Sequence, residues 1–177
     1  MRTHTKRINR TVLLVAVGLL MASCNSNIDD EPNVVLEIEQ MTSTPIAGTL
    51  SPTTGQCVFT ITNSSLTFKN KPKNGLSGAS ESPFNDIVLQ RINVDYVWDD
   101  GAALSGQSFG LAGTVPSGGS VVAQVPLANA TVLGSGAVPR DGHTATLQIT
   151  AFGVTVAGDP VVSQPFTGGT LAVNSCI

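Results

Sequence analysis

The stretch Ile87-Val-Leu-Gln-Arg-Ile-Asn-Val-Asp-Tyr-Val-Trp98 is the longest run of strand-forming residues in this chain. Its second half alternates strictly between apolar side chains on one face (Ile92, Val94, Tyr96, Trp98) and polar ones on the other (Arg91, Asn93, Asp95). Such a period of two predicts a β-strand with one buried face. Ile87 and Leu89 fall on the polar face, so we expect the first part of the strand to be covered on both sides. Asp99-Asp100-Gly101 then predicts a turn.

Shorter alternating runs lie on both sides of this stretch. Their apolar positions are Val34, Leu36 and Ile38; Cys57, Phe59 and Ile61; Leu66 and Phe68; Val121, Ala123, Val125 and Leu127; and Ala145, Leu147, Ile149 and Ala151. Thr170 to Cys176 predicts a last strand. The phase of the apolar residues changes twice. These changes predict a bulge or corner at Asn63-Ser64-Ser65 and a bulge at Gly153, where Phe152, Val154 and Val156 take the opposite face from Ala145 to Ala151.

These runs predict an all-β domain of about seven or eight strands with turns at regular intervals, the pattern of a β-sandwich. Pro116-Ser-Gly-Gly-Ser-Val-Val-Ala-Gln-Val125 resembles a strand entry of bacterial immunoglobulin-like modules, which implies an immunoglobulin-like β-sandwich. A jelly roll or a partly closed barrel is the alternative, because either would produce a similar succession of short strands.

The N-terminal residues have the pattern of a secretory leader. Arg2, Lys6, Arg7 and Arg10 precede an uncharged apolar run from Thr11 to Ser23, which is shorter than the about 20 residues of a membrane span. Leu19-Leu20-Met21-Ala22-Ser23-Cys24 resembles the lipobox of bacterial lipoproteins, although Met21 replaces the usual leucine. The alternative is an ordinary signal peptide with an incidental cysteine. We therefore predict a lipoprotein signal peptide at 1–23, a lipidated Cys24 with a polar tether at 24–32, and a β-sandwich domain at 33–177.

The lipobox resemblance implies a location and an anchor. Cys24 would carry several acyl chains, palmitate among them, because one chain alone holds a protein only marginally at a membrane. Asn25 follows the cysteine, and in the Gram-negative sorting pattern that this resembles, a residue other than Asp favours the outer membrane. We expect a cell-envelope protein that meets the membrane through its N-terminal lipid.

Charge excludes one class of partner. Removal of the leader leaves five basic and twelve acidic residues, a net charge of −7. Nucleic-acid binding depends on clustered Lys and Arg, so we expect no nucleic-acid partner. The one basic cluster, Lys69-Asn-Lys-Pro-Lys73, is interpreted as a solvated loop.

Two cysteines remain after Cys24, namely Cys57 and Cys176. An even pair in an exported domain predicts a disulfide, which here would close a loop of over 100 residues; two unpaired buried thiols are the alternative.

The mature domain offers little catalytic chemistry. His143 is its single histidine, and Gly134-Ser135-Gly136 lacks the spacing of a Gly-x-Ser-x-Gly elbow. A zinc site needs about four ligands, which Cys57, Cys176 and His143 do not supply. Asp95, Asp99 and Asp100 could offer oxygens to calcium, but Asp99-Asp100-Gly101 fits a plain turn equally well. We expect no cofactor and no metal.

Tyr96 and Trp98 are the only Tyr and Trp in the chain. Their shared phase with Ile92 and Val94 favours burial between the sheets, whereas exposure would let them stack on sugar rings. The sequence therefore predicts a lipid-anchored envelope protein with a non-catalytic binding or structural role, most simply an accessory module that meets other envelope proteins. A carbohydrate-binding module is the alternative, and an enzyme is the least supported interpretation.

Overall fold

The computed structural model describes residues 33–73, 82–134 and 140–176. The predicted signal peptide, Cys24 and the tether lie outside the described residues. The described part is almost entirely strand, as predicted, with one short 3₁₀ helix, η2 (Pro83–Asn85). The strands are β1 (Val34–Thr42), β2 (Ala47–Leu50), β3 (Cys57–Thr60), β4 (Asn63–Pro72), β5 (Ile87–Trp98), β6 (Ala103–Gly110), β7 (Thr114–Val115), β8 (Ser120–Pro126), β9 (Thr144–Thr155), β10 (Pro160–Val162) and β11 (Phe166–Ala172).

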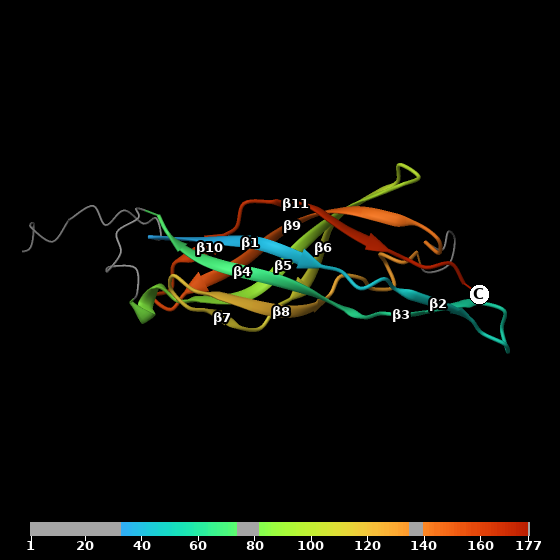
Figure 1. Ribbon diagram of the computed structural model, residues 1–177, viewed down its shortest axis with the longest axis horizontal. Coiled ribbons are helices and arrows are strands. Elements are labelled where there is room, and N and C mark those ends of the chain that lie inside the picture. Colours follow the sequence, from blue (N-terminus) through green and yellow to red (C-terminus); the bar gives the residue numbers. More distant parts are fainter. Residues whose placement is uncertain (1–32, 74–81, 135–139, 177) are drawn as a thin grey trace, which may run out of the picture. The chain divides into compact units, whose positions relative to one another are not determined.

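Two antiparallel sheets form a sandwich, which confirms the predicted fold class (Figure 1). One sheet has the order β1-β4-β8, and the other has β9 and β5 at its centre. β10 and β11 both pair with β9, while β6 and β7 both pair with β5. Because β5 and β9 are twelve residues long, each has room for two short partners, so the described residues form more strands than the seven or eight expected. β2 and β3 form a separate hairpin.

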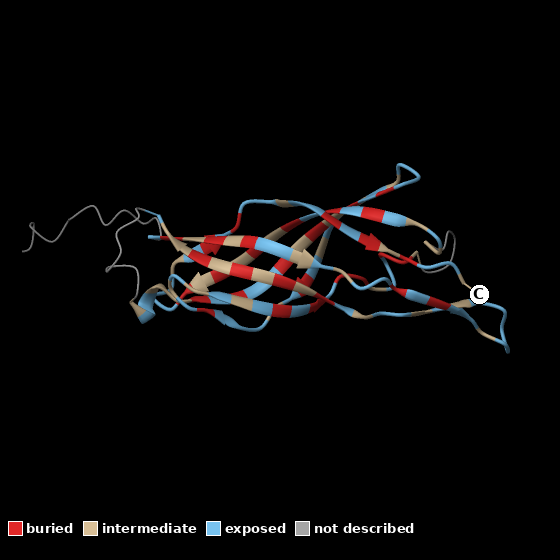
Figure 2. Ribbon diagram, in the orientation of Figure 1, coloured by how far each residue is buried: buried red, intermediate tan, exposed pale blue. Residues whose placement is uncertain are grey.

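The core lies between the two sheets and is built by the predicted alternation (Figure 2). The largest side chains that are almost fully buried include Tyr96, Phe68, Leu36, Ile92, Leu127, Leu147 and Ile149. Burial of each such side chain contributes roughly 1.5–3 kcal/mol relative to its exposure. The sandwich is therefore held chiefly by the alternate residues of its long strands.

The bulge predicted at Gly153 is instead in the neighbouring strand. The register between β5 and β9 shifts between Leu89 and Arg91, which places an extra residue, Gln90, in β5. That bulge turns Ile87 and Leu89 to the same buried face as Ile92, so the expectation that they lie on the opposite face is wrong.

In β9 the same alternate positions are buried along the whole strand. Gly153 and Thr155 are buried, and Phe152 and Val154 are only partly buried, which contradicts the predicted reversal. A Cβ on Gly153 would lie 2.8 Å from Cγ2 of Ile87. Glycine in a strand can mark either a bulge or the close approach of another backbone. At Gly153 the reason is the close approach of β5.

Three further local predictions need correction. Asn63 to Ser65 lie in β4 with unbroken pairing to β8, and the corner falls at residues 61–62, where the chain passes from the hairpin to the sandwich. Lys69 and Lys71 lie in β4 rather than in a loop, and each forms an ion pair across to β1, with Glu39 and Glu37 respectively. The last strand ends at Ala172, and Cys176 lies beyond it.

Candidate functional site

Tyr96 and Trp98 are buried, with 1% and 2% of their surface exposed. Their rings stack with centroids 6.3 Å apart, and the Tyr96 hydroxyl donates a 2.9 Å hydrogen bond to the carbonyl oxygen of Leu127. Burial raises the pKa of the Tyr96 hydroxyl far above its usual range. Neither ring is available to stack on a sugar, so the contact with a ligand suggested for these two residues has no basis in this structure.

A polar cluster surrounds the end of β5 that carries Trp98. The guanidinium of Arg140 lies 5.0 Å from the Trp98 ring centroid and 2.7 Å from a carboxylate oxygen of Asp100. Nδ1 of His143 lies 2.6 Å from a carboxylate oxygen of Asp99. The hydrogen bond with His143 lowers the pKa of Asp99, and the Ala102 N–H chiefly lowers that of Asp100. These carboxylates are therefore engaged in fixing the turn between β5 and β6 and its neighbours.

The surroundings of the polar cluster can be described for the residues that the structure places. Among the described residues, no serine or threonine hydroxyl forms a hydrogen bond with the His143 ring. The third carboxylate suggested for calcium, that of Asp95, accepts instead from the Gly106 N–H at 2.7 Å. Within residues 33–73, 82–134 and 140–176, no three His, Cys, Asp or Glu side chains are grouped so that they could hold a metal ion.

Cys57 and Cys176 form the predicted disulfide, with their Cα atoms 5.9 Å apart. The bond joins β3 to the segment after β11 and closes a loop across 119 residues. Gly48 in β2 makes room for it, since a Cβ at that position would lie 3.0 Å from Sγ of Cys176 and 3.2 Å from Sγ of Cys57. The disulfide therefore fixes the β2–β3 hairpin to the end of the sandwich.

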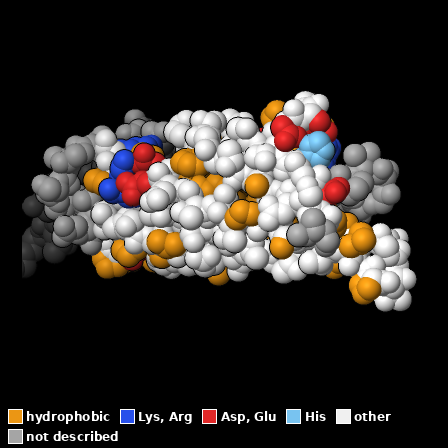
Figure 3. Space-filling view, turned by 45° about the vertical axis from the view of Figure 1, so that its right-hand side comes forward, with side chains coloured by type: hydrophobic (Ala, Val, Ile, Leu, Met, Phe, Trp, Pro, Cys, Tyr) orange, Lys and Arg blue, Asp and Glu red, His pale blue; other side chains and the backbone are white. Residues whose placement is uncertain are grey.

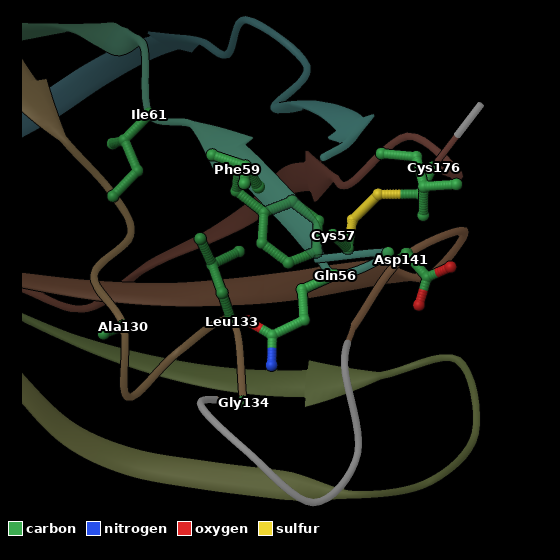
Figure 4. A pocket seen from close by; sticks show the side chains of 12 residues that line it. Gln56, Cys57, Phe59, Ile61, Ala130, Leu133, Gly134, Asp141 and Cys176 are labelled. Carbon is green, nitrogen blue, oxygen red and sulfur yellow. A yellow bond between two sulfur atoms is a disulfide. The ribbon is translucent and has the colours of Figure 1, made fainter. Parts of the chain in front are cut away.

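A hollow with a volume of about 870 Å³ lies beside this disulfide (Figure 4). We call it the hairpin pocket. Figure 4 shows Phe59, Ile61 and Leu133 directed toward one space, with the disulfide and Asp141 at one side. The described residues that line it are Leu50, Gly55, Gln56, Cys57, Val58, Phe59, Ile61, Ala130, Leu133, Gly134, Asp141 and Cys176.

Large apolar side chains are exposed around the hairpin pocket. Leu50, Val58 and Ile61 have 54%, 53% and 41% of their surface exposed. All three line the same pocket, so they form a local apolar surface. The space-filling view shows charged side chains gathered in few places, while much of the remaining surface is uncharged (Figure 3).

Sequence reasoning did not predict the hairpin pocket. Leu50 lies outside the alternating runs that the sequence shows, and Ile61 belongs to a run whose apolar positions are predicted to face inward. The opposite wall comes from residues 130–134, which are over 60 positions away in the chain.

The structure offers one observation on membrane contact. None of the helices formed by the described residues has the length and apolar character needed to cross a membrane.

Comparison with known proteins leaves the family open. No family model matches the chain. No curated protein matches it either. Among solved structures, the chain is similar to the solution structure of a candidate late embryogenesis abundant (LEA) protein, with a TM-score of 0.37 and 11% sequence identity over 94% of each chain.

Proposed function

We propose that this protein is a lipid-anchored component of the bacterial cell envelope whose β-sandwich serves as a non-catalytic binding module, most simply for another envelope protein. The observation that carries the binding role is the hairpin pocket. Its volume of about 870 Å³ falls in the range of about 300–1,000 Å³ typical of ligand sites. A disulfide holds its hairpin in place, and exposed apolar side chains surround it.

The chemistry of the lining supports binding over catalysis. Phe59, Ile61 and Leu133 supply apolar contact, while Gln56 and Asp141 supply one amide and one carboxylate. A hydrolytic site would need a nucleophile and a base within hydrogen-bonding distance of each other. His143, which pairs with Asp99, is not among the lining residues.

The anchor is proposed from the sequence alone. Cys24 follows a basic segment and an apolar run that ends in Leu19-Leu20-Met21-Ala22-Ser23. Acyl chains on Cys24 would hold the domain at the membrane, and in a Gram-negative cell Asn25 favours the outer membrane. The polar residues 25–32 would act as a tether between lipid and sandwich.

The anchor is tested by metabolic labelling of the full chain with a palmitate analogue in a bacterial host. We expect the wild-type chain to incorporate label and to partition into detergent, and the Cys24→Ser variant to do neither. The double variant Cys57→Ser/Cys176→Ser is the matched control, because it removes two cysteines and leaves Cys24 in place. Equal labelling of the wild-type and Cys24→Ser chains would refute lipidation.

The binding role is tested separately by chemical crosslinking in intact cells. We expect the wild-type chain to form a discrete crosslinked species with an envelope protein, and Ile61→Asp to lose it. Val122→Asp changes a side chain in β8 that is 58% exposed and is not among the described residues that line the hairpin pocket, so it should crosslink like the wild type. Crosslinks that survive Ile61→Asp unchanged would place the binding surface elsewhere.

A further inference from the structure

The β3 strand has an edge without a strand partner among the described residues, since the β2–β3 sheet is two-stranded. The Ser51 N–H donates to the Gln56 carbonyl at 2.8 Å, and the ladder pairs Thr49 with Val58. Because hydrogen-bonded and non-hydrogen-bonded pairs alternate in antiparallel strands, Cys57 and Phe59 direct their backbone N–H and C=O groups away from β2. This open edge is therefore a template for a further strand.

The open edge borders the hairpin pocket. Successive side chains of a strand point to opposite faces, so Val58 points away from the face shared by Cys57 and Phe59. All three nevertheless line the pocket. The pocket therefore extends along β3, with Leu133 and Ala130 on its opposite wall.

One charge lines the groove. Asp141 is the single charged side chain among the described lining residues, and among the described residues its carboxylate has no hydrogen-bond or ion-pair partner. A carboxylate beside an apolar groove favours a partner with a positive charge at the matching position.

We propose that the hairpin pocket binds an extended peptide segment of a partner protein, which adds as a strand to the open edge of β3. An apolar side chain of this segment enters the space between Phe59, Ile61 and Leu133, and a neighbouring Lys or Arg faces Asp141. Strand addition of this kind takes affinity from main-chain hydrogen bonds and specificity from the pockets that receive alternate side chains. This inference rests on the proposed binding role and names its partner class.

A second copy of the chain fits this groove less well. Pairing of two β3 edges would bring two acidic groove linings together. The basic side chains that could offset them are mostly engaged, because Lys69 and Lys71 pair with Glu39 and Glu37, and Arg140 pairs with Asp100. Charge thus favours a partner other than this chain.

The test uses a phage-displayed library of random nine-residue peptides, panned on the full-length protein in detergent micelles. We expect enriched peptides with alternating apolar residues and at least one Lys or Arg. Synthetic copies should bind Ile61→Asp at least about tenfold more weakly than the wild type. Asp141→Asn should weaken binding by a smaller factor and reduce its dependence on salt. Val122→Asp is the control and should bind as the wild type does.

Backbone methylation separates strand addition from simple apolar contact. N-methyl groups on every second residue should abolish binding in one register and be tolerated in the other, because only alternate N–H groups face β3. Equal tolerance in both registers, or binding unaffected by Ile61→Asp, would overturn the proposal. Failure to enrich any peptide would also overturn it, while loss of the in-cell crosslink in Ile61→Asp would still support the wider binding role. Concentration-dependent dimers of the wild type that Ile61→Asp abolishes would identify a second copy as the occupant instead.

Discussion

The Tyr96 hydroxyl in β5 donates a 2.9 Å hydrogen bond to the carbonyl oxygen of Leu127, the residue that follows β8 in the opposite sheet. Both residues are almost fully buried, at 1% exposure each. The bond therefore links the two sheets inside the core. It also satisfies a hydroxyl that would be costly to bury alone.

Tyr96→Phe tests this link, because it deletes one oxygen and keeps the ring. The Leu127 carbonyl would be left without its partner, so we expect a loss of about 1–3 kcal/mol in the free energy of unfolding. Urea denaturation of the domain, residues 33–177, measures this free energy of unfolding. A variant as stable as the wild type would show that water or another donor replaces the hydroxyl.

Trp98→Ala tests the burial of the second aromatic residue. Removal of a buried ring that stacks on Tyr96 and contacts Arg140 should cost about 3–5 kcal/mol. Val97→Ala is the matched control, because Val97 is the preceding residue and is 56% exposed, and it should change stability by about 0.5 kcal/mol or less. Denaturant melts of both variants give the comparison. Similar stabilities for the two variants would contradict the position of Trp98 in the core.

The disulfide predicts a redox-dependent stability. A closed loop across 119 residues corresponds to about 4–5 kcal/mol on the chain-entropy model. We expect reduction to lower the melting temperature of the domain by several degrees or more. Thiol titration of the unfolded, unreduced domain, residues 33–177, should find no free thiol, and two titratable thiols would refute the bond.

Gly48→Ala should destabilise the disulfide-bonded protein, because the added methyl group crowds the disulfide. The added Cβ would lie 3.0 Å from Sγ of Cys176 and 3.1 Å from the Asn174 carbonyl oxygen, so the hairpin must shift to accept it. We expect a lower melting temperature in the oxidised protein and a smaller loss after reduction. Gly110→Ala is the control, since a Cβ there meets no atom within 4 Å. Equal effects of Gly48→Ala in the oxidised and reduced proteins would show that the crowding acts elsewhere.

The features that could be predicted from the sequence are those that depend on the alternation of apolar and polar residues within one strand. The buried faces of β1, β8 and the second half of β5 follow directly from apolar residues at every second position, and the disulfide was predicted from an even pair of cysteines in a domain expected to be exported. What the sequence did not predict depends on contacts between distant segments. The phase change at Gly153 was attributed to β9, because only the paired register shows that Gln90 of β5 is the extra residue.

The same limit applies to the candidate site. Ile61 continues the alternation of Cys57 and Phe59, so the sequence predicts burial, yet the chain leaves the hairpin at that point and leaves Ile61 41% exposed. Its opposite wall at Leu133 is brought there by the packing of the whole domain. A pocket formed between a hairpin and a distant turn has no pattern in the sequence that marks it.

The contact between Asp99 and His143 predicts a pH dependence. The hydrogen bond with His143, followed by that from the Thr144 N–H, lowers the pKa of Asp99 below its ordinary value of 3.8. A carboxylate whose pKa is depressed by folding stabilises the folded state above its ordinary pKa, and this contribution is lost as the pH falls through the depressed value. The stability difference between the wild type and Asp99→Asn should therefore be largest above about pH 4 and shrink in more acidic solution.

Carbon-13 NMR titration of the Asp99 carboxyl group measures this shift directly. We expect its midpoint below 3.8 in the wild type. In His143→Ala the midpoint should rise, because the largest cause of the depression is removed, and it should stay partly depressed, because the Thr144 N–H still donates to the carboxylate at 3.0 Å. The side chains of both residues are partly exposed, so salt should weaken the electrostatic part of the effect. A midpoint that is the same in the two proteins would show that His143 does not control Asp99, and the turn after β5 would then be fixed by its backbone hydrogen bonds alone.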